Sequence, residues 1–413
     1  MTEYNFSDKS PWERIRRKRI SRLLPKAMKL AEVDSWIIIC RENANDPLAD
    51  HVGGENAGKE MAIIFTLENE SVHSTAFCPW GEVVGLKEMN VHDEIITLEN
   101  PEHLYSEVAK MMHEINPEKI AINSSNKNIS DGLSYTQRKK LEDALNFMKS
   151  NLVSSQDLVS EWLSVKLDEE VDIMREAGKL TVKIIEDAYR KIVPGVTKDS
   201  DVASWIRSDL EKYGVKDGWS PNHNPSVNSG VARGHASASD KIIEPGDFIQ
   251  TDFGIKVYDR WCTDYQRFAY VLDKEQNKVP KEDLDKWKAA IKGHRLVLDE
   301  MKPGVMGYDL DLAQRDWMSE SGSDNVKWGT GHPVGYFAHD IGPALTGGQR
   351  EVPPTDALRV LREGQVFAYD GFYAWQVDEG ERLISVEEMA VVTKEGGEYL
   401  IEPQEDLIII KAK

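Results

Sequence analysis

Two stretches in the second half of the chain decide its fold: EPGDFIQTDFG at residues 244–254 and REGQVFAYDGF at residues 362–372. Each carries an apolar run that ends in an aspartate, which is Asp252 in the first stretch and Asp370 in the second. Short apolar runs of this kind predict buried strands. The match between the two stretches predicts that the second half of the chain is internally duplicated, with Asp252 and Asp370 in equivalent positions.

A second pair of segments precedes these strands and repeats in the same order. PGVTKDSDVASWIRSDLEKYG at 194–214 and PGVMGYDLDLAQRDWMSESG at 303–322 both begin with Pro-Gly-Val, continue as a helix and end in glycine. The repeat distance of about 110 residues is too long for a solenoid. Two copies of a helix–helix–sheet unit can instead pair about a pseudo-two-fold axis. A site on that axis would receive acids from both halves.

The beginning of the chain has the pattern of a separate α/β domain. A chain of 413 residues is longer than one ordinary core supports, so two domains are expected. Alternating strands and helices predict an α/β domain over residues 1–155, and a charged helical stretch at 153–192 leads into the duplicated domain over 156–413. In the first domain, helices are expected at 12–32 and 101–115, and strands at 35–40, 61–67, 72–78, 94–98 and 119–125.

The composition excludes several classes of protein. A net charge of -20 argues against nonspecific binding to nucleic acid or to anionic membranes, because both carry negative charge. No apolar run approaches the roughly 20 residues of a membrane helix, and the polar, basic stretch from Met1 to Arg19 lacks the apolar region of a secretory signal. The 3 isolated cysteines offer no disulfide framework, which is typical of a reducing compartment, so a cytoplasmic location is expected.

Asp252 and Asp264 are the first candidate metal ligands. The stretch between them reads as a hairpin that brings the two acids side by side. Two unpaired carboxylates this close would repel, and one would take up a proton unless a divalent cation lies between them. The alternative is that one acid forms an ion pair with Arg260 or Arg267.

Asp370 and Glu387 are the matching candidates in the second copy. Both lie in apolar runs that read as strands, where an uncompensated charge would be costly. By the repeat, they are expected to stand where Asp252 and Asp264 stand in the first copy. Glu388 competes with Glu387, because the alternation of a strand places only one of the two on the inner face.

Three histidines complete the candidate site. His332 lies in the glycine-rich run GTGHPVGYFAHDIGP, where the backbone can approach a ligand closely, and His339 follows seven residues later. His235, in GVARGHASAS, precedes the acid hairpin and is interpreted as a histidine that faces the substrate; the alternative is a turn residue. One imidazole among several carboxylates suits Mn, Co, Fe or Zn.

These motifs resemble the pita-bread metallopeptidases, which include aminopeptidase P, prolidase and their non-metal relative creatinase. The resemblance covers nearly the whole chain. The family's acid–Gly–acid–Arg strand motif is matched by Asp252-Phe-Gly254, Asp264 and Arg267, and its closing motif by Ser-Val-Glu387-Glu388-Met. The family's ligand histidine and the substrate histidine seven positions later fall on His332 and His339, and the histidine ahead of the hairpin falls on His235.

The resemblance implies an α+β pita-bread catalytic domain after a creatinase-type α/β domain. It implies hydrolysis of a peptide bond near a free N-terminus, most often Xaa-Pro, by water that two divalent ions activate. Those ions would be held by Asp252, Asp264, His332, Asp370 and Glu387. His235, His339 and Glu387 would act on the substrate, which would be a small peptide. A homodimer is expected, because such relatives commonly form one.

Two departures from the family leave alternatives open. Asp370 stands where the family has Glu, and Ser385 stands where it has Arg. These changes keep a metal site but permit another metal-dependent reaction, such as C–N hydrolysis of a small zwitterion or a lyase reaction. A non-catalytic binding protein that kept the fold is the third possibility. Creatinase relatives replace most of the ligands with uncharged residues, whereas this chain keeps an acid or histidine at all five positions.

Overall fold

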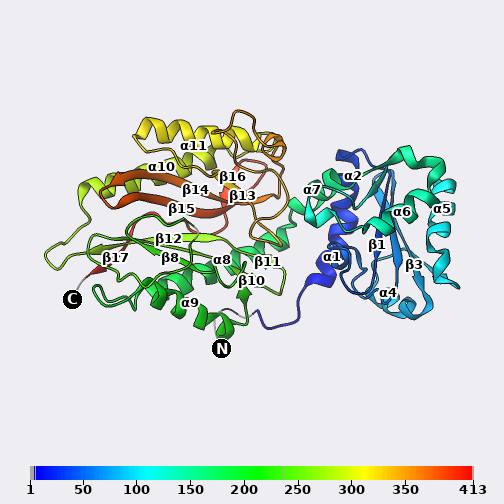
Figure 1. Cartoon of the computed structure of the whole chain (residues 1–413), viewed down its shortest axis with the longest axis horizontal. Helices are drawn as coiled ribbons and strands as arrows, with labels where there is room; N and C mark the ends of the chain where they lie inside the picture. The colour runs from blue at the N-terminus through cyan, green and yellow to red at the C-terminus, as the bar shows by residue number, and fades with distance from the viewer. Residues whose placement is uncertain (1–3, 5, 235, 412–413) are drawn as a thin grey trace. The chain divides into compact units, whose positions relative to one another are not determined.

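The computed structural model describes residue 4 and residues 6–234 and 236–411. His235, one of the residues expected to face the substrate, therefore lies outside the described residues. The chain forms two compact units: Ser10–Leu163, and Ser164–Lys413 together with the N-terminal residues up to Lys9 (Figure 1). The division expected between residues 155 and 156 precedes helix α7 (Gln156–Ser164), and the observed one lies at its end.

The first unit is built on one mixed sheet of six strands in the order β4-β3-β2-β1-β5-β6. The central strand β1 pairs antiparallel with β2 and parallel with β5, and every residue from Ser35 to Cys40 is buried. Its helices are α1 (Trp12–Arg22), α2 (Leu24–Leu30), α3 (Ala49–Val52), α4 (Val83–Met89), α5 (Leu104–Ile115) and α6 (Tyr135–Ala144). Its strands are β1 (Ser35–Cys40), β2 (Met61–Glu68), β3 (Ser71–Pro79), β4 (Glu94–Leu98), β5 (Ile120–Ile122) and β6 (Leu152–Ser154).

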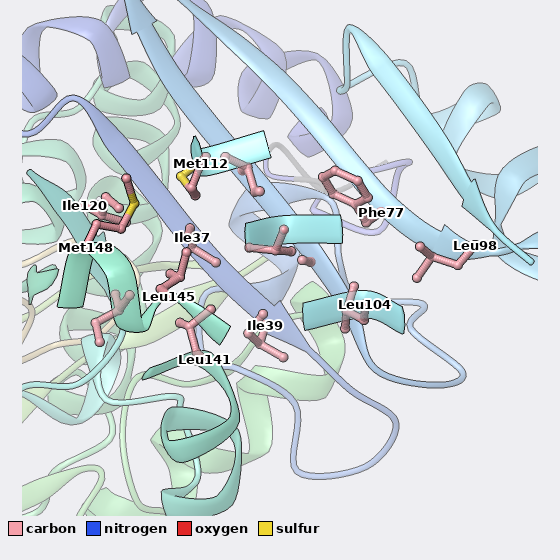
Figure 2. Packing of buried hydrophobic residues seen from close by; sticks show 14 residues of the cluster. Ile37, Ile39, Phe77, Leu98, Leu104, Met112, Ile120, Leu141, Leu145 and Met148 are labelled. Atoms are coloured by element: carbon pink, nitrogen blue, oxygen red, sulfur yellow. The ribbon is translucent and has the colours of Figure 1, made fainter. Parts of the chain in front are cut away.

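Alternation along β1 sends side chains to both faces of this sheet. Ile37 and Ile39 lie on one face, in a core cluster with Leu104 and Met112 of α5 and Leu141 of α6 (Figure 2). Trp36 lies on the other face, where its ring meets the Trp162 ring edge-on at 5.6 Å. The sheet is covered on both faces, which explains why β1 reads as one continuous apolar run.

The second unit contains two four-stranded sheets, β17-β12-β9-β8 and β13-β14-β15-β16, and a small sheet β11-β10-β7. Helices α10 and α11 lie over β14 and β15, while α8 and α9 lie on the side of β12 and β8 (Figure 1). The helices are α8 (Asp168–Tyr189), α9 (Asp199–Tyr213), α10 (Lys281–Glu300) and α11 (Gly307–Ser321). The strands are β7 (Lys216–Asp217), β8 (Ser226–Ser229), β9 (Phe248–Phe253), β10 (Ile255–Val257), β11 (Trp261–Cys262), β12 (Tyr265–Leu272), β13 (Gly331–Pro333), β14 (Val366–Val377), β15 (Gly380–Val392), β16 (Gly397–Tyr399) and β17 (Ile408–Lys411).

The predicted duplication is present in the backbone of this unit. In each copy a helix, a Pro-Gly turn and a second helix precede the paired strands that carry the acids. The stretches 244–254 and 362–372 turn at Gly246 and Gly364. The φ angles of these glycines, 88° and 85°, lie in the left-handed region that favours glycine. The two copies therefore share a local conformation as well as a sequence pattern.

The pairing register corrects one part of the predicted repeat. Asp370 on β14 lies directly opposite Glu387 on β15, but Asp252 on β9 lies directly opposite Gln266 on β12. The first-copy equivalent of Glu387 is therefore Gln266, and Asp264 lies two residues before it. The prediction was wrong because spacing along the chain does not reveal which residues of a hairpin face each other.

A candidate two-metal site between two strand pairs

Four carboxylates and one imidazole line a single cavity of about 1000 Å³ in the second unit. Asp252 comes from β9, Asp264 precedes β12, Asp370 and Glu387 face each other across β14 and β15, and His332 lies on β13. The His332 Nε2 atom lies 3.8 Å from Asp264 Oδ2 and 3.7 Å from Glu387 Oε1. These five residues, called the acid cage below, are the ones that the sequence predicted as metal ligands.

The acid cage has the donor set of a divalent metal site. Donor atoms of Asp264, His332 and Glu387 all lie within 4.8 Å of one another. The first two acids and the last two come from different halves of the duplicated unit, so the cage lies where the two copies meet. Three carboxylate and imidazole donors this close can share one hard or borderline cation. The described residues therefore fit the ions that the fold family implies.

Burial makes the cage electrostatically costly without a cation. The pKa of Asp264 is raised well above 3.8, first by burial and then by the charges of Glu387, Asp252 and Asp370. The pKa of Asp370 is also raised well above 3.8, by burial and by Glu387 and Asp252. Like charges gathered in a dry site favour the protonated form, and a cation would restore the charged form.

We expect the metal-free protein to lose stability as the pH rises. Because the folded pKa of Asp264 lies above its unfolded value, the folded state binds a proton that the unfolded state releases, and the free energy of unfolding falls as pH increases above about 4. Thermal unfolding of chelator-treated protein between pH 5 and pH 8 should show this fall. Asp264→Asn should reduce the slope, and added Mn²⁺ should reduce it in the wild type. An equal slope in the wild type and the variant would contradict the assignment.

Glu387 and Glu388 were competing candidates, and the structure shows which of the two faces the cavity. Both side chains are buried, but Glu387 lines the cavity whereas Glu388 accepts two hydrogen bonds from Arg267, at 3.0 and 3.1 Å. Successive residues of a strand point to opposite faces, so only one of the two can reach the cage. The sequence left open an ion pair between Arg267 and one of the first two acids. Arg267 instead binds Glu388 and thereby links β12 to β15.

Gln266 contacts the cage and was not predicted from the sequence. Its Nε2 atom donates to Glu387 Oε2 at 3.0 Å and lies 3.4 Å from Asp370 Oδ1. Its Oε1 atom accepts from the Ser385 hydroxyl at 2.8 Å and from Gln250 Nε2 at 2.5 Å. A signal was available in the sequence: Gln266 is a polar residue two positions after Asp264 in a mainly apolar strand, so it shares the face of that acid.

His339 lies beside the cage. Its ring meets the His332 ring edge-on, with the centroids 4.1 Å apart, and it lines the same cavity while remaining exposed. This placement allows His339 to contact a molecule bound in the cavity, and its role toward a substrate stays a prediction. Beyond the cage, the cavity wall includes aromatic and charged side chains that the sequence did not indicate, among them Trp219, Lys256, Trp328 and Phe337.

Comparison with known families identifies the second unit. The family model described as "Metallopeptidase family M24" matches residues 172–394. That match covers both copies of the repeat and all five residues of the acid cage. Across residue 4 and residues 6–234 and 236–411, no helix has the length and apolarity needed to cross a membrane.

Individual relatives extend the similarity over more of the chain. "Uncharacterized peptidase YqhT" of Bacillus subtilis is 28% identical over 271 residues, which is 63% of this chain and 69% of that protein. The X-Pro aminopeptidase of Thermotoga maritima aligns with a TM-score of 0.67 and 21% identity, over 93% of this chain and 100% of its own. The Xaa-Pro dipeptidase of Bacillus anthracis aligns with a TM-score of 0.64 and 20% identity, over 96% and 100%. At these identities the two solved structures show the shared fold.

Proposed function

The chain belongs to metallopeptidase family M24, and from that premise we propose that it hydrolyses a peptide bond near a free N-terminus, in particular one that precedes proline. The observation that carries the proposal is the acid cage, in which four buried carboxylates and His332 meet in one cavity. The descriptions of the two solved neighbours, an aminopeptidase and a dipeptidase for Xaa-Pro, support the proline preference. A homodimer in the cytoplasm remains a further part of the proposal.

The proposed roles of the cage residues are metal binding and proton transfer. Asp252, Asp264, His332, Asp370 and Glu387 would together hold two divalent ions. When bound, such ions activate water at neutral pH and polarise a carbonyl oxygen. Glu387 accepts the proton of the attacking water. His339, which is exposed in the cavity beside His332, donates a hydrogen bond to the carbonyl oxygen as negative charge develops there. The same role is proposed for His235.

A substrate screen combined with elemental analysis tests the proposed function. The purified full chain is assayed against Xaa-Pro dipeptides, longer Xaa-Pro peptides and matched peptides without proline, with and without added Mn²⁺ or Co²⁺. We expect cleavage that requires metal and is fastest for bonds that precede proline. No cleavage of any peptide, at any measured metal content, would contradict the proposal.

Asp370 and Ser385 favour a second candidate function. Asp370 has a shorter side chain than the glutamate of the pita-bread pattern, and Ser385 replaces its arginine with a hydroxyl that donates to Gln266. These changes lie within the cavity wall and would alter what the site holds. Metal-dependent hydrolysis of a C–N bond in a small zwitterion is the alternative, and cleavage of no peptide by a metal-loaded enzyme would favour it.

Removal of the Gln266 amide should weaken metal binding. The amide holds one oxygen of Glu387 and lies beside one of Asp370, and groups that orient metal ligands typically contribute 10- to 100-fold in affinity. We expect Gln266→Leu to lower the affinity for Mn²⁺ by about that factor, measured by titration calorimetry of the chelator-treated protein. Gln376 is an exposed residue of β14, and Gln376→Leu is the matched control. Unchanged affinity in Gln266→Leu would show that the carboxylates hold their positions without the amide.

A further inference from the structure

Lys256 on β10 is the one lysine or arginine among the described residues that line the cavity of the acid cage. It is half-buried, and it forms no ion pair within 4.0 Å with a carboxylate in the described part of the chain. The side chain across the strand pair from it is the buried thiol of Cys262. The ammonium group of Lys256 is therefore a cation in the cavity wall that has no carboxylate partner in the described part of the chain.

The positive charge of Lys256 is not needed to neutralise the acid cage. The carboxylates of Asp252, Asp264, Asp370 and Glu387 would be balanced by two divalent ions, so that the lysine remains available to an anionic group of the substrate. A lysine ammonium on its four-carbon stem is a mobile point charge that suits a carboxylate. Lys256 is therefore a charged group inside the cavity but outside the cage.

The short segment between Asp252 and Lys256 keeps the lysine close to the acid cage. Lys256 follows Asp252 by four residues, through the β9–β10 segment, and four residues span at most about 14 Å. The ammonium group sits at the end of a flexible four-carbon stem. A carboxylate that lies one peptide residue beyond the bond at the cage falls within this reach.

Phe337 supplies an apolar surface next to the ammonium group. The Lys256 Nζ atom lies 5.1 Å from the centre of the Phe337 ring, a cation–π contact that holds the charge over the ring. The Phe337 side chain lines the cavity and is 47% exposed, so its surface is accessible. A pyrrolidine ring or another apolar side chain next to the bound carboxylate could cover it.

From this arrangement we propose that Lys256 binds the C-terminal carboxylate of a dipeptide, with Phe337 against the side chain of the same residue. The inference rests on the proposed peptidase function and goes beyond it by naming the substrate class: dipeptides with a free carboxylate, rather than amidated or longer peptides. Lys256 is a specificity residue, and it takes no part in the bond cleavage.

Paired substrates that differ only in charge test this inference. The metal-loaded full chain is assayed with Ala-Pro and Ala-Pro-amide, and with Ala-Ala and Ala-Ala-amide. For the wild type we expect kcat/KM to be about 10- to 100-fold higher for the acids than for the amides, the range for a hydrogen bond to a charged group. Lys256→Met should remove this preference by raising KM for the acids, leave the amides unchanged, and leave kcat nearly constant. Lys256→Arg should restore most of the preference.

Lys216→Met is the matched control. Lys216 is the strand partner of Lys256 on β7, is exposed and pairs with Asp259 at 2.6 Å outside the cavity. This variant should keep the preference of the wild type for acids. If Lys256→Met does not fold, the wild-type ratio of acid to amide and the ratio in Lys256→Arg still decide the question.

The outcomes separate this inference from the proposed function. Equal cleavage of acids and amides by the wild type would overturn the role of Lys256 and leave the peptidase assignment intact. An equal loss on acids and amides in Lys256→Met would show a structural role and would also overturn it. Cleavage of none of the four peptides by the metal-loaded wild type would overturn the proposed function and, with it, this inference.

Discussion

Asp264→Asn should reduce metal-dependent peptide hydrolysis by about 1,000-fold or more, since metal-centred stabilisation is worth several kcal/mol and each 1.36 kcal/mol is a factor of ten. Asp264 is central to the cage: its Oδ2 atom lies 3.8 Å from His332, and the charges of Glu387, Asp252 and Asp370 all act on it. Asparagine keeps the size of the side chain but offers a neutral ligand with one oxygen. The measurement is kcat/KM on the best substrate of the screen, together with the metal content of wild type and variant.

Asp259→Asn is the control for this experiment. Asp259 lies in the same hairpin, is exposed, pairs with Lys216 outside the cavity, and has a left-handed φ of 56° that asparagine also tolerates. This variant should keep the activity and the metal content of the wild type. Wild-type turnover in Asp264→Asn, with the metal content measured, would remove Asp264 from the site.

Arg267→Ala should lower the free energy of unfolding of the second unit by about 3–5 kcal/mol, the usual effect of breaking a buried ion pair. Arg267 and Glu388 are each 2% exposed and share two hydrogen bonds, so the variant leaves a glutamate buried without its cation. Burial already raises the pKa of Glu388, and Arg267 is the main charge that lowers it. The measurement is the stability of the full chain by denaturant unfolding.

The pH dependence of this loss identifies its cause. Without Arg267 the pKa of Glu388 rises further, so the folded variant favours a protonated glutamate and its stability falls as pH increases. The loss should therefore be larger at pH 8 than at pH 5. The double variant Arg267→Met, Glu388→Leu removes both charges and should recover most of the loss. Lys179→Ala, which breaks an exposed pair with Glu176, should change little. A loss in Arg267→Ala that is equal at both pH values would point to lost packing.

Local patterns predicted most of the strands of the first unit, and the repeated helices and the acid-bearing strands of the second unit. The run SWIIIC is strand β1, and the runs that begin at residues 61 and 94 are strands β2 and β4. The expected helix at 12–32 is in fact two helices, because Pro25 lies at the start of α2 and cannot continue the hydrogen bonding of α1. Helices α3, α4 and α6 and strand β6 of the first unit were not predicted. α6 buries only Gln137 and Leu141, so its apolar periodicity is weak.

The amino-acid sequence by itself determined the duplicated second domain, the residues of the acid cage and the family resemblance. These depend on residue type, spacing and repetition, which are properties of the linear chain. The tertiary structure alone decided which acid of a neighbouring pair faces the cavity, why Gln266 rather than Asp264 is the counterpart of Glu387, and that Lys256 shares the cavity with the cage. The physical reason is distance along the chain: Gln266 and Glu387 are 121 residues apart, and their contact exists only because two sheets pack face to face.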